Sequence, residues 1–275
     1  MSASQTVSYR HVGKCVYCPN PRGLRLTTEH IIPEKLGGKE VLYAASCDDC
    51  REKTQKIESH VLSQMLDGAR AYLGLRGQKR GAPQRGHAYV RDAENNPRAI
   101  SIDPAEAPIG AILPHWGPPT ILMKPGATWP GRPSLKLYGS ETKLAEWMSV
   151  YGSYVSGKLR PELFVQMLAK IAHCCTIDAV GIDAFEPYLP PIILGDMSTA
   201  PRLIGCHKFE PAQKPGNAYR IEQRSIEIFN VEYFLVIIRL FTYWETPTYW
   251  VIAGHPKGPP SPRAFGPLPP RSPES

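Results

Sequence analysis

The 275-residue sequence predicts an α+β fold, in which a small unit of strand, strand and helix precedes a larger α+β domain with antiparallel strands. Three observations lead to this prediction. Two C-x-x-C pairs bracket a short segment near the N-terminus. A stretch that begins at Pro161 carries apolar residues at helical spacing, and the segments after Tyr219 are rich in β-branched and aromatic residues, as strands are. The length suffices for one large or two small domains, each with its own core.

The N-terminal unit is predicted over residues 1–66, and its elements follow one another closely. LTTEHII is expected to be a strand that Pro33 ends, Gly37-Gly38 supplies a turn, and VLYAAS is expected to be the second strand. A helix is expected to begin at about Asp48, because an acidic side chain suits the positive N-terminal end of a helix. The order is therefore ββα.

The predicted helix has two faces of different polarity. Its apolar stripe comprises Ile57, Val61, Leu62 and Met65. Its opposite face carries Arg51, Thr54, Gln55 and Glu58. Because these four positions fall within roughly a hundred degrees of one another, the polar face can point across the hairpin toward Glu29 and His30.

The rest of the chain is divided by composition. Residues 67–96 are predicted to be a basic linker, residues 97–254 the larger α+β domain of unknown role, and residues 255–275 a disordered, proline-rich tail. The part of this domain from 97 to 134 is rich in proline and glycine, which indicates irregular connections around short strands such as Thr120 to Met123.

A helix and several strands are expected in the remainder of the larger domain. In PELFVQMLAKIAHCCTIDAVG, Pro161 suits a first helical turn and Gly181 can cap the end. Strands are expected in IEIFNVEYFLVIIRLFTYW and TYWVIAG, interrupted at Asn230 and Pro247.

The charge and hydropathy of the chain favour some partners over others. A formal net charge of +7 favours an anionic partner such as nucleic acid. MSASQTVSYRHVGK lacks the apolar segment of a signal peptide, and the most apolar run, Tyr233 to Ile238, is far shorter than the roughly 18 residues of a membrane span. We therefore expect a cytoplasmic protein without a membrane partner, in a compartment where thiols stay reduced.

Four of the seven cysteines form two pairs with the spacing of metal ligands. Cys15-Val-Tyr-Cys18 and Cys47-Asp-Asp-Cys50 are separated by the 28 residues 19–46. Zinc prefers four such ligands in a tetrahedron, so the spacing predicts a structural Zn²⁺. Buried thiols or a redox pair are the alternatives, although one C-x-x-C would suffice for redox chemistry. The remaining cysteines, Cys174, Cys175 and Cys206, lack ligand spacing, and Cys174 and Cys175 are expected to be core residues because they lie inside the apolar helix.

Taken together, the motifs of residues 15–58 resemble a known family. C-x-x-C, then T-x-E-H-I-I-P-x-x-L-G-G, then A-S-C-x-x-C-x-x-x-T-x-x-x-E is similar to the HNH endonucleases of bacteria and their phages, in the subgroup whose zinc knuckles flank a ββα-metal nuclease core. The resemblance implies metal-dependent hydrolysis of DNA phosphodiester bonds, with double-stranded DNA as the partner.

The resemblance also implies roles for individual residues. His30 would be the general base that deprotonates the attacking water, a task that suits a group titrating near neutrality. Glu29 would be a ligand of one catalytic Mg²⁺ or Mn²⁺, which would stabilise the leaving oxygen. The four cysteines would hold the separate Zn²⁺. Neighbours on a strand face opposite sides, so joint action of Glu29 and His30 requires a bulge or a strand end, which Pro33 favours.

The sequence departs from the family pattern on the helix and the second strand. Many members have histidine or asparagine directly after the last cysteine, where this chain has Arg51, and a ligand one turn on, where it has Gln55. The family's central asparagine, expected near Val41-Leu42, is also missing. Glu58 lies on the right face and is a further candidate ligand, or it orients neighbours. Arg51 could hold a phosphate instead.

Basic residues are candidates for contacts with nucleic acid. These candidates are Arg51, Arg76, Lys79, Arg80 and Arg85. A solvated linker is the alternative for the last four. Six other histidines have no partner spacing and are expected to be non-catalytic: His60, His87, His115, His173, His207 and His255. The alternative to the nuclease is a catalytically inactive, zinc-binding nucleic-acid-binding or adaptor protein.

Overall fold

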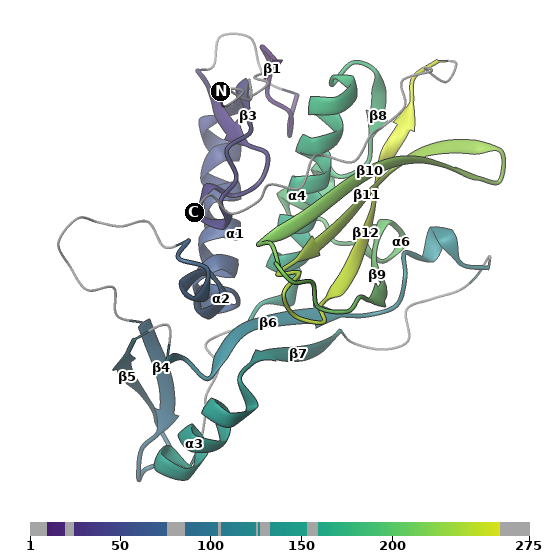
Figure 1. The fold of residues 1–275 in the computed structure, drawn as a ribbon. Coiled ribbons are helices and arrows are strands. Elements are labelled where there is room, and N and C mark those ends of the chain that lie inside the picture. The colour runs from purple at the N-terminus through teal and green to yellow at the C-terminus, as the bar shows by residue number, and fades with distance from the viewer. Residues whose placement is uncertain are drawn as a thin grey trace, which may run out of the picture.

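The structure, a computed structural model, describes residues 10–19, 25–75, 86–103, 106–124, 126, 133–152 and 159–258. Within these residues the fold is a mixture of helices and mostly antiparallel sheets (Figure 1), so the predicted α+β class is confirmed.

The N-terminal part forms a three-stranded sheet followed by a helix. β2 (Leu26–His30) pairs with β3 (Val41–Cys47) in antiparallel orientation, and β1 (Arg10–His11) pairs with the other edge of β3 in parallel orientation. α1 (Asp48–Gln64) begins directly after β3, with two aspartates in its first turn. The 3₁₀ helix η1 (Glu34–Leu36) lies in the connection between β2 and β3. The predicted strand, strand and helix are therefore confirmed.

The segment predicted as a basic linker contains regular structure where the structure describes it. α2 (Asp67–Tyr72) follows α1 closely. β4 (Gly86–Arg91) forms an antiparallel hairpin with β5 (Pro97–Ile102). Residues 76–85 lie outside the described residues.

The proline- and glycine-rich segment also forms a hairpin. β6 (Ile109–His115) pairs with β7 (Ser134–Gly139), and α3 (Glu141–Tyr151) follows, capped by the Ser140 side chain. The strand expected from Thr120 to Met123 is wrong, because η3 (Thr120–Leu122) is a 3₁₀ helix. The amide of Leu122 bonds back to the carbonyl of Pro119 at 2.9 Å, which is a helical bond and not a ladder bond.

The C-terminal part is a helix packed on an antiparallel sheet. α4 (Pro161–Val180) ends at Gly181, as predicted. The sheet has the order β10-β11-β12-β8, and β9 also pairs with β12. The strands span Tyr219–Ile228 (β10), Val231–Leu240 (β11), Pro247–Pro256 (β12), Phe185–Pro187 (β8) and Ile204–Phe209 (β9). Two short helices, α5 (Pro190–Leu194) and α6 (Ala200–Leu203), connect β8 to β9.

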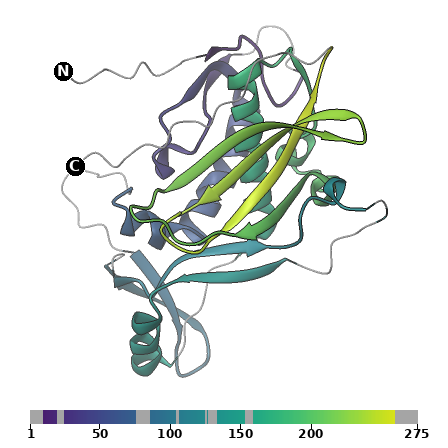
Figure 2. The same ribbon diagram turned by 45° about the vertical axis from the view of Figure 1, so that its right-hand side comes forward.

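One continuous hydrophobic core joins the N-terminal and C-terminal parts. α4 lies between α1 on one side and strands β11 and β12 on the other (Figures 1 and 2). The core runs through buried side chains of all these elements, for example Leu42, Val61, Phe164 and Ile238. α4 is long and apolar enough by composition to cross a membrane, but 78% of that stretch is buried inside the protein. The domain boundary predicted after residue 66 stays a prediction, and the core continues across it.

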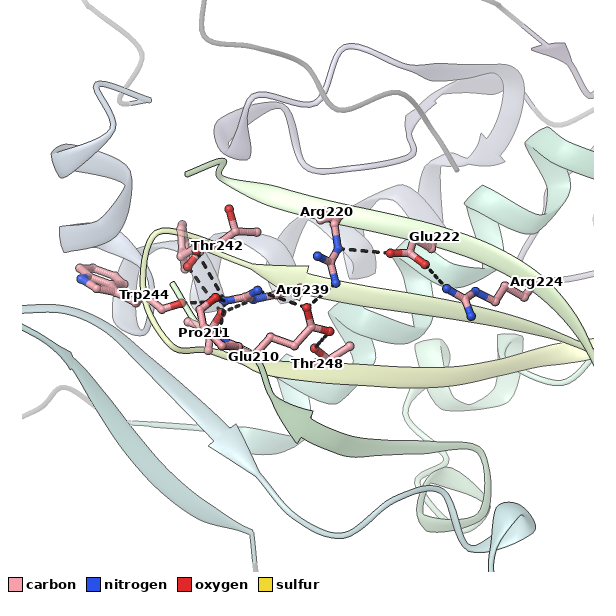
Figure 3. Close-up of polar contacts among 11 residues, drawn as sticks. Glu210, Pro211, Arg220, Glu222, Arg224, Arg239, Thr242, Trp244 and Thr248 are labelled. Carbon is pink, nitrogen blue, oxygen red and sulfur yellow. Dashed lines mark hydrogen bonds and ion pairs between the residues drawn. The ribbon is translucent and has the colours of Figure 1, made fainter. Parts of the chain in front are cut away.

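A buried arginine organises the loops at one end of the sheet (Figure 3). The guanidinium of Arg239 on β11 is 1% exposed and donates hydrogen bonds to the backbone carbonyls of Glu210, Pro211 and Trp244 at 2.7, 2.8 and 2.9 Å. Its charge is balanced by the Glu210 carboxylate, which also pairs with Arg220 at 2.6 Å. This arginine thereby satisfies loop carbonyls that would otherwise be buried without partners.

Candidate functional site

The four predicted cysteine ligands lie together. Their sulfur atoms are all within 4.8 Å of one another, and the Cys18 and Cys47 sulfurs are 3.7 Å apart. A tetrahedral zinc with Zn–S bonds of about 2.3 Å places its sulfurs about 3.8 Å apart. The cluster therefore fits a metal ion such as zinc, and no group of at least three metal-ligating side chains other than this one occurs among the described residues.

Local structure brings the two pairs together. Cys15 and Cys18 lie in the loop after β1, and the amide of Val16 bonds to the carbonyl of Ala45 on β3 at 2.8 Å. Cys47 is the last residue of β3 and the N-cap of α1, and Cys50 lies in the first helical turn. The change from strand to helix therefore fixes the positions of Cys47 and Cys50. Backbone pairing with β3 holds Cys15 and Cys18 next to them.

The thiols differ in acidity. Burial raises the pKa of the Cys15 thiol, but hydrogen bonds from the backbone amides of Cys47, Tyr17 and Cys18 outweigh burial and lower the pKa below its ordinary value. Burial raises the pKa of Cys18 to about 11 and raises that of Cys50 further. Zinc binds thiolates, so loading the cluster is expected to release protons.

A second polar cluster forms between the N-terminal unit and α4. The ammonium nitrogen of Lys170 on α4 lies 3.0 Å from Glu29 Oε1 and 2.7 Å from Glu58 Oε1. It also donates a hydrogen bond to the backbone carbonyl of His30. The Lys170 side chain is 1% exposed, and those of Glu29 and Glu58 are 7% and 19% exposed. The strand and the helix thus bring the two predicted carboxylate ligands together, and both contact a lysine.

A bulge sets the position of Glu29. The pairing of β2 with β3 changes register between Thr27 and Glu29, and Ala44 on the opposite strand has a φ of +49°. After this bulge Glu29 is buried, whereas His30, the last residue of β2, is half-buried. Among the residues that the structure describes, none hydrogen-bonds to the His30 imidazole; its contact with Lys170 is through the backbone.

The catalytic divalent ion implied by the HNH resemblance does not fit this arrangement. Mg²⁺ takes oxygen ligands at about 2.0–2.1 Å in near-octahedral geometry. The Lys170 ammonium lies between the two carboxylates that would supply such ligands, and a divalent ion at that point would contact a like charge. As arranged, the residues hold a lysine and not a divalent ion.

The predicted nucleic-acid contacts are described only in part. Arg51 is partly exposed on α1 and pairs with Asp48 at 3.0 Å, and Gln55 is exposed one turn on. Arg76, Lys79, Arg80 and Arg85 lie outside the described residues. Arg70, another basic residue of this region, is buried and donates a hydrogen bond to the Lys35 carbonyl at 2.9 Å, so its role is structural.

The connection between β2 and β3 depends on two glycines. Gly37 has a φ of +86°, which few other residues adopt. A Cβ atom on Gly38 would lie 2.2 Å from the Ile32 carbonyl oxygen, so only glycine allows the two backbone segments to approach. The L-G-G of the motif therefore closes a tight loop, with Leu36 fully buried beneath it.

The α4 residues that contact the N-terminal unit are not among the residues predicted from the sequence. Besides Lys170, His173 hydrogen-bonds through Nε2 to the carbonyl of Val16 at 2.7 Å, and Cys174 Sγ lies 3.3 Å from the hydroxyl of Tyr17. Both Val16 and Tyr17 lie between the first two cysteines. A signal was present, because Lys170 is a charged residue within an apolar helical stripe, where an unpaired charge would be costly.

Two polar centres thus meet one face of α4. The cysteine cluster is contacted through Val16 and Tyr17, and the Glu29–Lys170–Glu58 cluster includes a side chain of α4 itself. No known protein family, curated protein or solved structure matches the chain.

Proposed function

We propose that the protein is a nuclease of the HNH type that hydrolyses phosphodiester bonds in DNA. The observation that carries this proposal is the convergence of Glu29 from the strand and Glu58 from the helix on one cation, directly beside the strand end where His30 lies. The bracketing cysteine cluster and the ββα order support it, because both belong to the motif on which the resemblance rests.

The proposed chemistry uses residues of the ββα unit. His30 is half-buried at the end of β2 and serves as the general base that takes a proton from the attacking water. Arg51 is partly exposed on α1 and holds a phosphate oxygen of the substrate. The net charge of +7 favours the approach of a polyanion.

A second candidate function is a zinc-bearing nucleic-acid-binding or adaptor protein without catalysis. The observation that favours it is the Lys170 side chain, which neutralises carboxylates that a metal-dependent nuclease needs free. The replacement of the expected helix ligands by Arg51 and Gln55 points the same way.

Nicking of supercoiled plasmid separates the two functions. Zinc-loaded wild-type protein is compared with His30→Ala and with the matched control His207→Ala, which removes an exposed histidine of β9. We expect His30→Ala to lower the nicking rate on the order of a hundredfold, since general-base catalysis contributes about that much, and His207→Ala to leave it unchanged. Equal rates for wild type and His30→Ala would rule out the role of His30. DNA binding without nicking, with or without Mg²⁺ or Mn²⁺, would favour the second candidate.

A further inference from the structure

Three oxygen atoms surround the ammonium of Lys170. Two are carboxylate oxygens that form ion pairs with it, Glu29 Oε1 at 3.0 Å and Glu58 Oε1 at 2.7 Å, and the third is the backbone carbonyl oxygen of His30, which accepts a hydrogen bond from it. These oxygens come from β2 and α1, whereas the lysine comes from α4. Two elements therefore supply oxygens around a cation that a third element provides, much as several elements surround a bound ion.

The lysine remains charged in this buried position. Burial by itself lowers the pKa of Lys170, but attraction to the Glu29 and Glu58 carboxylates outweighs burial and raises the pKa above its ordinary value. An uncharged amine would leave two buried carboxylates without a counter-charge, which is costly. The side chain therefore places one positive charge between the two carboxylates.

We propose that Lys170 is the built-in cation of this site and takes the place of the divalent ion that the resemblance to HNH endonucleases implies. The wild-type protein then holds Glu29 and Glu58 together without Mg²⁺ or Mn²⁺. The inference rests on the proposed function for the role that this charge plays in the reaction. That a lysine side chain fills the cation site does not depend on catalysis.

Removal of the ammonium is expected to create a site for a divalent ion. In Lys170→Met the apolar stem is kept, and three oxygens that faced the ammonium are left around one point. Carboxylate and carbonyl oxygens are the ligands that Mn²⁺ and Mg²⁺ prefer. The two carboxylates also lose their neutralising partner, which strengthens their attraction to an added cation.

Titration with Mn²⁺ tests this directly. Zinc-loaded full-length protein is titrated, and the free ion is measured by its paramagnetic resonance signal. We expect Lys170→Met to bind one Mn²⁺ about tenfold or more tightly than wild type. The matched control Lys56→Met removes an exposed lysine that pairs with Glu52 at 2.6 Å on α1, and it is expected to behave like wild type. Lys170→Met/Glu29→Gln is expected to lose the gain.

Two results of this titration would overturn the inference. The first is a folded Lys170→Met protein that binds Mn²⁺ no more tightly than wild type. The second is a wild-type protein that already binds an Mn²⁺ ion, with binding that the Glu29→Gln substitution abolishes. The metal would then displace the Lys170 ammonium from the site. The second result needs no Lys170 variant, so the inference stays testable if Lys170→Met fails to fold.

The wild-type ammonium can also be observed. A buried, hydrogen-bonded lysine ammonium exchanges its protons slowly and gives a nitrogen-15 resonance of its own, which we expect to be unchanged by millimolar Mg²⁺. A resonance that Mg²⁺ displaces would contradict the inference. None of these measurements requires DNA cleavage, so an inactive protein would count against the proposed nuclease and leave the built-in cation standing.

Discussion

At the scale of single residues, His173 shows how burial sets a protonation state. Its side chain is fully buried on α4, and its ring packs near Tyr17 and Phe185, with centroids 5.9 and 6.2 Å away. Burial lowers the pKa of His173 to about 4, despite the hydrogen bond to the Val16 carbonyl, which favours the charged form. The folded protein therefore holds this histidine neutral at pH 7.

The buried histidine predicts a loss of stability in mild acid. The folded pKa of about 4 lies below the ordinary value of 6.5, so between these values the unfolded chain binds a proton that the folded chain does not. The free energy of unfolding therefore falls as the pH drops from about 6.5 to about 4, by on the order of 3 kcal/mol from this residue. Urea unfolding of wild type and His173→Gln at several pH values measures it.

The comparison of His173→Gln with wild type controls for the other groups that titrate in acid. Protonation of the clustered cysteine thiols affects both proteins, so only the difference between them reports on residue 173. We expect His173→Gln, whose amide can still donate to the Val16 carbonyl, to lose less stability on acidification. Identical pH dependence in the two proteins would contradict the assignment.

At the scale of elements, the loop between β2 and β3 determines whether the ββα unit closes. Gly38→Ala would place a Cβ atom 2.2 Å from the Ile32 carbonyl oxygen, a backbone atom that cannot rotate away. We expect a loss of about 2–3 kcal/mol in the free energy of unfolding, measured by urea denaturation. Gly37→Asn is the matched control, since asparagine tolerates the left-handed conformation, and its cost should stay within about 1 kcal/mol. Equal losses in the two variants would argue against the close approach.

Elements with a strong local pattern were predictable from the sequence. The helix from Pro161 was predicted because its apolar residues recur at helical spacing, and the strands after Tyr219 because they are rich in β-branched and aromatic residues. The hairpin of β6 and β7 was not, because its strands lie in a proline- and glycine-rich segment where local signals favour loops. The strand expected at Thr120 to Met123 was wrong, because this short segment forms a 3₁₀ turn directly after Pro119.

The residues of the candidate site were predictable from the sequence only where they follow a local pattern. Cys15, Cys18, Cys47 and Cys50 could be grouped because metal-ligand spacing is a local property, and Glu29 could be matched with Glu58 by helical phase. Lys170 could not be placed beside them. Periodicity shows that a side chain faces the core, but it does not show which residues the side chain contacts there. His30, one of the residues that Lys170 contacts, is 140 positions away in the sequence.

At the scale of the whole molecule, α4 joins the N-terminal unit that carries the cysteine cluster to the sheet. It packs against α1, β11 and β12 within one continuous hydrophobic core. The three polar contacts from Lys170, His173 and Cys174 tie the same helix to the N-terminal unit. We therefore expect the N-terminal unit and the larger body to unfold together.

Removal of zinc tests this coupling. We expect about one zinc ion per chain by elemental analysis, since four cysteine ligands complete a tetrahedron. Chelation should lower the temperature of a single unfolding transition by roughly 10 °C, because the metal stabilises a unit that shares its core with the rest. Added zinc should restore the original temperature. Two separate transitions, of which only one responds to chelation, would show instead that the N-terminal unit is an independent domain.

The position of Lys170 in the chain also has a consequence during synthesis on the ribosome. Residue 170 follows His30 by 140 positions, so at about 5–20 residues per second it emerges roughly 7–30 s after the strand it neutralises. Throughout that interval neither Glu29 nor Glu58 can contact Lys170. The N-terminal segment therefore completes this cluster of charges only after α4 has left the ribosome.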